Sequence, residues 1–162
     1  MFNRVGRAVG QCRAQPDAGG PSWLMNRGED TIKGFIGNIE DRTEENRDYR
    51  RVLYTGPHMQ LVLMALRPGE EIGEEVDGDR DQFFRVEKGE GEVWIDGTKT
   101  KIESDMAIVV PAGARHNIRN SGEKPLKLYT LYAPPQHADG TVQATKADAE
   151  ASKEHFAGQT SE

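Results

Sequence analysis

Residues 68–91 read PGEEIGEEVDGDRDQFFRVEKGEG, and residues 104–120 read SDMAIVVPAGARHNIRN. In the first segment, an acidic loop precedes an alternating strand at residues 82–87. In the second, a buried strand at residues 107–110 leads through a Pro-Ala-Gly turn into a strand that carries His116. Between the two segments, Asp96-Gly97 predicts the tip of a β-hairpin. Short strands with tight turns, which direct polar side chains toward one place, predict a small antiparallel β-barrel with a site inside it.

The segment at residues 59–66 is the most apolar part of the chain. Its odd-numbered positions, from Met59 to Ala65, are apolar, and so are Val62, Met64 and Leu66, which predicts a strand buried on both faces. In a small barrel, one of these faces looks into the interior. The other face needs a cover, which a second layer of sheet, the N-terminal arm or another subunit can supply. We therefore expect a homodimer.

Further strands are predicted on both sides of this stretch, at residues 35–39, 51–55 and 126–132. The highly charged segment at residues 40–49 predicts a solvated turn or one helical turn. If Gln82 points into the barrel, then Phe84 and Val86 point inward as well, because alternate side chains of a strand share a face.

The chain divides into three parts. Residues 1–33 form an N-terminal arm, partly flexible by its composition. Residues 34–136 form the barrel, and residues 137–162 form a C-terminal tail with a short peripheral helix that Thr145 begins. In the alternative for the arm, its apolar side chains anchor it on the barrel or on a partner subunit; these are Phe2, Val5, Trp23, Leu24 and Met25.

The composition argues against several classes of protein. The 27 acidic residues outnumber the 21 basic residues, and the net charge of −6 argues against a nucleic-acid partner. Cys12 is the one cysteine, so no internal disulfide can form. No apolar run approaches the roughly 18 residues that a membrane span needs, and no apolar signal segment begins the chain. We expect a cytoplasmic protein without a membrane partner.

A complete Pro-x-Gly-x-x-His-x-x-x-Asn motif consists of Pro111, Gly113, His116 and Asn120. This motif is the second of the two that mark the cupin superfamily, which the chain resembles. Gly69 matches the start of the first motif, and two glycines, Gly89 and Gly91, lie near its end. The resemblance is closest to small single-domain bacterial cupins of the mannose-6-phosphate isomerase-like type. It implies an all-β fold, a single jelly-roll-like cupin β-barrel.

The resemblance also implies a set of metal ligands. The ligand positions of the cupin motifs fall on Glu75, Asp77, Gln82 and His116. Usual cupin sites hold three histidines and one glutamate, whereas this set has one imidazole and three oxygen donors. An oxygen-rich set suits hard divalent ions such as manganese, iron(II) or magnesium, and zinc is a further candidate.

Structural explanations compete with this interpretation. The acidic run around Glu75 and Asp77 can be a solvated face, and His116 can be a histidine whose hydrogen bonds the core satisfies. His58 and His137 lie in predicted turns and are expected to be loop or rim residues. We assign no functional role to His155 or to the thiol of Cys12.

Three functions follow as hypotheses. The first is a metal-dependent, isomerase-like or lyase-like enzyme that acts on a small polar or carbohydrate-derived substrate, with His116 and Glu75 as catalytic residues. The second is a metal-free binding module that holds a small molecule among Phe84, His116 and Gln82. The third is a metal-free sugar isomerase or epimerase with His116 as its base.

Overall fold

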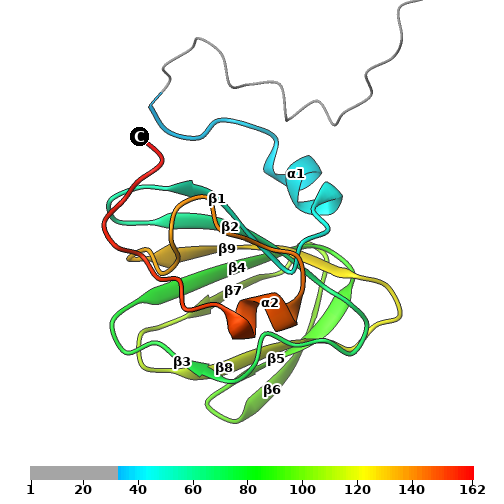
Figure 1. Ribbon diagram of the computed structural model, residues 1–162. Helices are drawn as coiled ribbons and strands as arrows, with labels where there is room; N and C mark the ends of the chain where they lie inside the picture. The colour runs from blue at the N-terminus through cyan, green and yellow to red at the C-terminus, as the bar shows by residue number, and fades with distance from the viewer. Residues whose placement is uncertain (1–32) are drawn as a thin grey trace, which may run out of the picture. The chain divides into compact units, whose positions relative to one another are not determined.

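The computed structural model describes residues 33–162, which form two antiparallel sheets packed face to face (Figure 1). The predicted all-β cupin-like barrel is therefore confirmed. The predictions for the N-terminal arm, including its apolar anchors and Cys12, fall on residues outside the described part.

The larger sheet has six strands in the order β10 (Val142–Gln143), β1 (Arg50–Thr55), β2 (Gln60–Leu66), β9 (Leu126–Ala133), β4 (Asp81–Lys88) and β7 (Ala107–Val110). The smaller sheet has four strands in the order β3 (Glu75–Val76), β8 (Arg115–Asn120), β5 (Glu90–Ile95) and β6 (Thr98–Glu103). Two short helices accompany them, α1 (Ile39–Glu45) and α2 (Lys146–Ala151).

The hairpin predicted at Asp96-Gly97 joins β5 to β6. Both residues have positive φ, 47° at Asp96 and 81° at Gly97. This combination belongs to the two-residue turn that matches the twist of paired strands. The Asp96 carboxylate also accepts a hydrogen bond from the backbone N–H of Arg115, which ties the hairpin to the start of β8.

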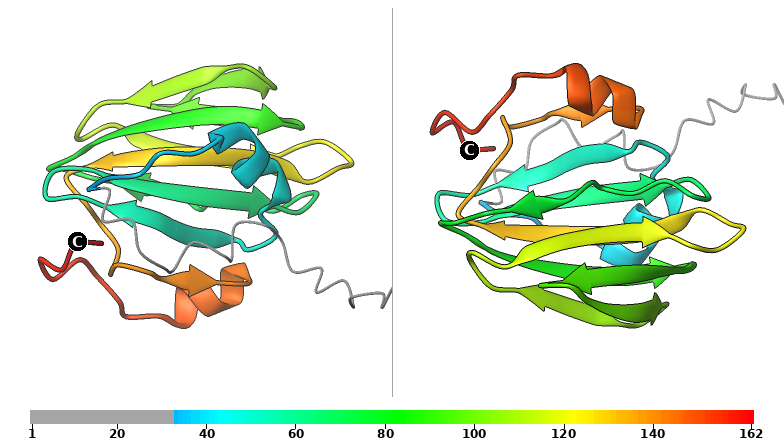
Figure 2. Two further views of the ribbon diagram at one scale, coloured as in Figure 1. Left: turned by 90° about the horizontal axis from the view of Figure 1, so that it is seen from above. Right: turned by 90° about the horizontal axis from the view of Figure 1, so that it is seen from below.

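Strand β2 is buried on both faces, as its sequence predicts. Val62, Met64 and Leu66 point into the space between the sheets, where they join the main hydrophobic cluster. Leu61 and Leu63 lie on the outer face of the larger sheet and are also buried. Helix α1 lies across that outer face (Figure 2), where Lys88 of β4 pairs with Glu44 at 2.6 Å.

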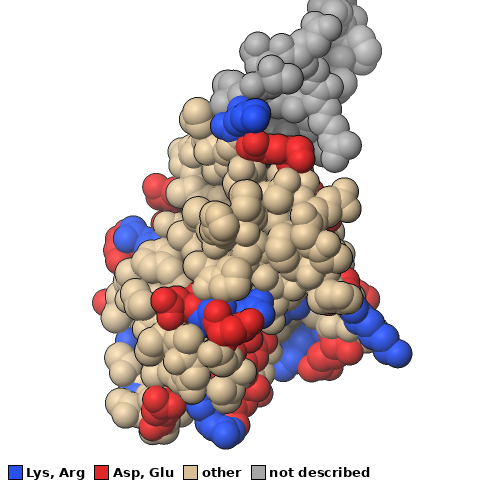
Figure 3. Space-filling view, turned by 90° about the vertical axis from the view of Figure 1, so that its left-hand side faces the viewer, with Lys and Arg blue, Asp and Glu red and all other residues tan. Residues whose placement is uncertain are grey.

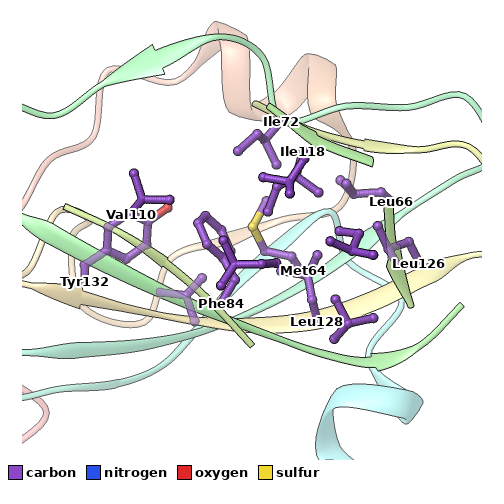
Figure 4. Packing of buried hydrophobic residues seen from close by; sticks show 14 of the residues in the cluster. Met64, Leu66, Ile72, Phe84, Val110, Ile118, Leu126, Leu128 and Tyr132 are labelled. Carbon is purple, nitrogen blue, oxygen red and sulfur yellow. The ribbon is translucent and has the colours of Figure 1, made fainter. Parts of the chain in front are cut away.

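The space between the sheets has an apolar end and a polar end. At the apolar end, Leu66 and Leu126 lie opposite each other on β2 and β9. Figure 4 shows them on one side of the cluster, with Tyr132 and Val110 on the other. Beside Tyr132, the register places Gln60 on β2 and Gln82 on β4, so a polar row crosses the sheet there.

Two sequence predictions of local structure are wrong. Residues 35–39 form no strand; Ile39 begins α1, and Asn38 caps it by accepting a hydrogen bond from the Asp41 N–H. The strand Ala107–Val110 is half-buried rather than buried, because β7 is an edge strand and Val109 faces outward.

The C-terminal tail adds to the fold. Strand β10 pairs with β1, and α2 follows at the same side of the molecule (Figure 2). Thr145 caps α2 in the predicted position, in a capping box completed by Asp148. The helix is short, as predicted, and its Ala149 packs against the hydrophobic cluster. No helix among residues 33–162 is long and apolar enough to span a membrane.

Candidate functional site

The polar end of the space between the sheets holds the candidate site. His116 of β8 lies opposite Glu75 of β3 in the smaller sheet. Gln82 faces them from the larger sheet, because it occupies an inward position of β4 next to Tyr132 of β9. Phe84 is two residues further along β4 on the same face, and its ring centre lies 6.1 Å from that of His116. The two cupin motifs thus meet across the barrel.

His116 has an oxygen atom within hydrogen-bond distance of each of its ring nitrogens. Its Nε2 lies 3.1 Å from Gln82 Oε1, and its Nδ1 lies 3.3 Å from the carbonyl oxygen of Ala114. The Gln82 amide donates to the Thr130 hydroxyl at 3.1 Å, so its oxygen is the atom that faces the histidine. Both oxygens only accept, and a neutral imidazole has one N–H to donate, so the shorter contact, to Gln82, places the proton on Nε2.

Glu75 is the acid of the site. Its carboxylate lies 3.9 Å from His116 Nε2 and its side chain retains 28% exposure, so it is the side of the site nearest to solvent. Burial raises the pKa of Glu75 above its ordinary value, while the positive charge of Arg50 and then His116 act in the opposite direction. A carboxyl with a raised pKa can bind and release a proton nearer to neutral pH than an exposed one.

Asp77 approaches the site from the other end of β3 but turns toward a different partner. Its Oδ1 lies 3.7 Å from Arg80 Nε, and its Oδ2 is buried without a hydrogen-bond partner. Its backbone carbonyl accepts from the Gly113 N–H at 2.7 Å, where φ of Gly113 is 84°. The motif glycine therefore holds the loop that carries Asp77 against the turn before His116.

The last residue of the second motif, Asn120, has a structural role. Its side chain is fully buried, donates to the carbonyl oxygens of Leu66 and Lys124, and accepts from the Gly122 N–H. These bonds close the turn between β8 and β9 at the apolar end. Asn120 thus belongs to the frame rather than to the site.

The four predicted ligand positions do not form a prearranged metal centre. Within the described part of the chain, no three His, Cys, Asp or Glu side chains lie close enough together to hold a metal ion. A metal on Nε2 of His116 would have to replace the proton that Gln82 accepts. Asp77 would have to leave Arg80. The donor set, as arranged, fits a hydrogen-bonded site better than a coordination sphere.

Two residues of this end were not predicted from the sequence. Arg50 of β1 is 9% exposed; its Nη1 donates to Gln143 of β10 at 3.0 Å, while its Nε has no partner. His137, predicted at the rim, is 5% exposed instead. Its ring meets the Tyr132 ring edge-on with centres 5.2 Å apart.

No local signal identifies either residue. Arg50 begins a strand in a highly charged segment, and His137 follows two prolines in what reads as a loop. Their burial depends on β10 and on Glu154, which lies 17 residues beyond His137 in the chain. The pairing of the C-terminal tail with β1 is the feature that brings them into the site.

One face of the described residues carries charged side chains of both signs. On the face drawn in Figure 3, acidic and basic side chains lie next to one another beside a broad uncharged area. Such mixed charge is unlike the continuous basic patch that a nucleic-acid partner needs.

Comparisons with known proteins agree with this architecture. The family described as Cupin domain matches residues 62–132. The uncharacterized protein YrkC of Bacillus subtilis (strain 168) is 47% identical over 128 residues, which cover 75% of this chain and 69% of that protein. An uncharacterized protein of Acanthamoeba polyphaga mimivirus is 43% identical over 113 residues, which cover 67% of this chain and 70% of that protein.

A solved structure is similar as well. A crystal structure of a Bacillus halodurans protein at 1.41 Å resolution matches with a TM-score of 0.73 and 48% sequence identity. The match covers 75% of this chain and 97% of that chain. The part left uncovered in the present chain is a quarter of its length.

Proposed function

The chain belongs to the cupin domain family, and on that basis we propose that it binds a small polar or carbohydrate-derived molecule at the polar end, without a prearranged metal centre. The observation that carries this proposal is the chain of contacts from Thr130 through Gln82 to His116, with Glu75 at 3.9 Å. A row of polar groups buried in an apolar core lowers the stability of the fold unless each group has a hydrogen-bond partner or binds a ligand.

The site offers both polar and apolar groups to a ligand. Glu75, the more exposed member, presents a carboxyl whose pKa burial raises, so it can accept or supply a proton. Phe84 provides an apolar wall beside the imidazole. His116 holds Gln82 through Nε2, and Glu75, 3.9 Å from the same nitrogen, is the group that a ligand meets first. These groups would hold a ligand in one orientation. Such an arrangement suits binding without catalysis and also proton transfer.

The metal-dependent enzyme is the competing hypothesis, and metal titration separates the two. We expect calorimetric titration of the purified protein with manganese or zinc to show no stoichiometric binding. Asp77→His supplies a second imidazole at one of the predicted ligand positions and should increase zinc affinity, because nitrogen donors suit zinc. Tight binding by the unaltered chain that His116→Ala abolishes would establish the metal-dependent form instead.

The binding proposal itself is tested by NMR with a panel of small sugars and polyols. A ligand at this site should shift the side-chain signals of His116 and Gln82 saturably. His116→Ala should abolish the response while the remaining spectrum stays that of a folded protein, and His58→Ala, at an exposed loop position, should leave it unchanged. If no compound in the panel moves the His116 signals, the proposed function is wrong.

A further inference from the structure

Buried polar atoms without a partner gather at the polar end. Among residues 33–162, five such side-chain atoms occur: Arg50 Nε, Asp77 Oδ2, Arg85 Nε, Gln136 Oε1 and His137 Nε2. Arg85 lies on the outer face of the larger sheet, where its Nε is 3.6 Å from Glu87. The other four belong to the end of the molecule that carries His116. Native proteins leave few buried polar atoms unpaired, so a group of four calls for a partner.

Contacts between the segments show that the four atoms share one region. Arg80 lies between two of them: its Nε faces Asp77 at 3.7 Å, and its Nη1 donates to the carbonyl of Pro135 at 3.2 Å, next to Gln136. The positive charge of Arg50 lowers the pKa of both Glu75 and His137, which places the guanidinium near each of them.

His137 is held in place with unusual thoroughness. The Gln60 side chain donates to the His137 carbonyl at 2.8 Å and accepts from its N–H at 3.0 Å. Glu154 holds the imidazole through Nδ1 at 2.8 Å and also accepts from the Ala138 N–H at 2.7 Å. Gln60 thus holds the backbone of His137 and Glu154 holds Nδ1, so Nε2 is the ring nitrogen that has no hydrogen-bond partner.

The hydrogen bond to Glu154 determines what Nε2 can do. A carboxylate accepts, so Nδ1 of His137 carries the proton and Nε2 presents a lone pair. Burial, and next the charge of Arg50, lower the pKa of His137 from 6.5 to about 4. At neutral pH the ring is therefore uncharged, and Nε2 is a buried acceptor beside Tyr132.

We infer that His137, held by Glu154, is the second binding subsite of the barrel, and that it accepts a hydrogen bond from a hydroxyl group of an uncharged, polyhydroxylated ligand. The four atoms define that chemistry. Three of them accept, and only Arg50 Nε donates, so the complementary molecule is rich in O–H donors. This inference rests on the proposed function and names the class of ligand for the same site.

The charges of the region favour a neutral ligand over an acid. Glu75 and Asp77 both carry carboxyls here, and Asp77 adds to the electrostatic cost of ionising Glu75. An anionic ligand would meet these groups, whereas a polyol can donate to Asp77 and to His137 alike. Arg50 has Gln143 and the nearby Glu75 to complement it, so it does not require an acid.

The tautomer of His137 gives a test that needs no ligand. Nitrogen-15 NMR of the histidine side chains should show proton on Nδ1 and none on Nε2 at neutral pH. In Glu154→Gln, the amide oxygen satisfies the Ala138 N–H and its NH₂ faces Nδ1, so the proton should move to Nε2. Glu150→Gln, at an exposed position of α2, is the matched control and should change nothing. A proton on Nε2 in the unaltered protein overturns the inference.

Three compounds with three carbons test the ligand class. Glycerol should shift the His137 Nε2 signal saturably; 1-propanol, with one hydroxyl, and glycerate, with a carboxylate, should bind at least about tenfold more weakly. Glu154→Gln should weaken glycerol binding by a similar factor. If glycerol moves the His116 signals but not those of His137, the subsite is wrong and the proposed function stands. If glycerol moves neither, while sugars move His116 alone, ordered water satisfies the four atoms and the inference is likewise overturned.

Discussion

At the scale of single residues, the burial of His137 links the stability of the fold to pH. An unfolded histidine binds a proton below about pH 6.5, whereas the folded chain binds one at His137 only below about pH 4. Between these values the unfolded state holds more protons, so the free energy of unfolding falls as the pH falls. This contribution is complete above pH 6.5 and is lost by about pH 4.

The size of the effect follows from the same two values. A difference of about 2.5 pKa units corresponds to about 3 kcal/mol at most. Urea unfolding at several pH values should show that His137→Gln is less dependent on pH between 6.5 and 4 than the unaltered chain. The exposed His58→Gln should retain the original dependence. Parallel curves for the unaltered chain and His137→Gln would show that His137 is not buried in its neutral form.

A glycine gives the second prediction at this scale. An added Cβ at Gly91 would lie 2.5 Å from the backbone oxygen of Arg119, on the neighbouring strand. Since a strand backbone cannot move away without losing its ladder, Gly91→Ala should destabilise the fold by about 1–3 kcal/mol. At Gly78, no atom lies within 4 Å of the added Cβ. Chemical denaturation should place Gly78→Ala close to the original chain; equal losses in both variants would contradict the explanation.

The sequence predicts a site residue when the neighbouring strand and turn residues determine which way its side chain points. His116 and Gln82 sit in alternating strands next to turn residues, so their inward direction follows from strand periodicity. The roles of Arg50 and His137 depend instead on residues far away in the chain, such as Gln143 and Glu154. Burial of this kind is decided by tertiary pairing, which no local pattern encodes.

At the scale of elements, Gln60 joins the start of β2 to the loop that follows β9. Its amide donates to the Thr55 hydroxyl and to the His137 carbonyl, and its oxygen accepts from the N–H groups of Gln136 and His137. Gln60→Leu should cost about 2–4 kcal/mol of stability, because buried backbone groups lose their partners. In Gln60→Leu, the backbone amide of His137 should exchange its hydrogen faster than in the unaltered chain. The amides in the interior of β9 should change less. Gln159→Leu, at an exposed position, is the control; unchanged exchange in Gln60→Leu would count against the role of Gln60.

The elements also show where periodicity misleads. The strand predicted at residues 35–39 has the right composition for a strand, but Asn38 caps a helix that begins at Ile39. The capping signal of Asn38 and the glycines before it favour the start of a helix, and this preference outweighs the strand preference of a short apolar run. By contrast, β2, β4 and β9 agree closely with prediction, because each has at least six residues of consistent pattern.

At the scale of the whole molecule, the homodimer stays a prediction: α1 already covers the outer face over β2, so a partner would pack on the part of this face next to β7. Phe83 and Tyr129 pair on this face with ring centres 6.2 Å apart, and Val109 on the edge strand β7 is 65% exposed. Light scattering at micromolar concentration should return twice the mass of one chain. Val109→Lys should shift the mass toward that of one chain, while Val76→Lys, on the smaller sheet, should not. A single-chain mass for the unaltered protein would rule the dimer out.

The division of the barrel into an apolar and a polar end has a consequence for how this scaffold can evolve. Leu66 and Leu126 lie at the end of the hydrophobic cluster away from Tyr132 and Val110. Substitutions at Glu75 or Asp77 therefore meet solvent and loop atoms before they meet the core. A lineage can exchange the chemistry of the mouth by one or two codon changes while the hydrophobic half maintains folding. The same barrel can thus pass from one ligand to another without a poorly folded intermediate.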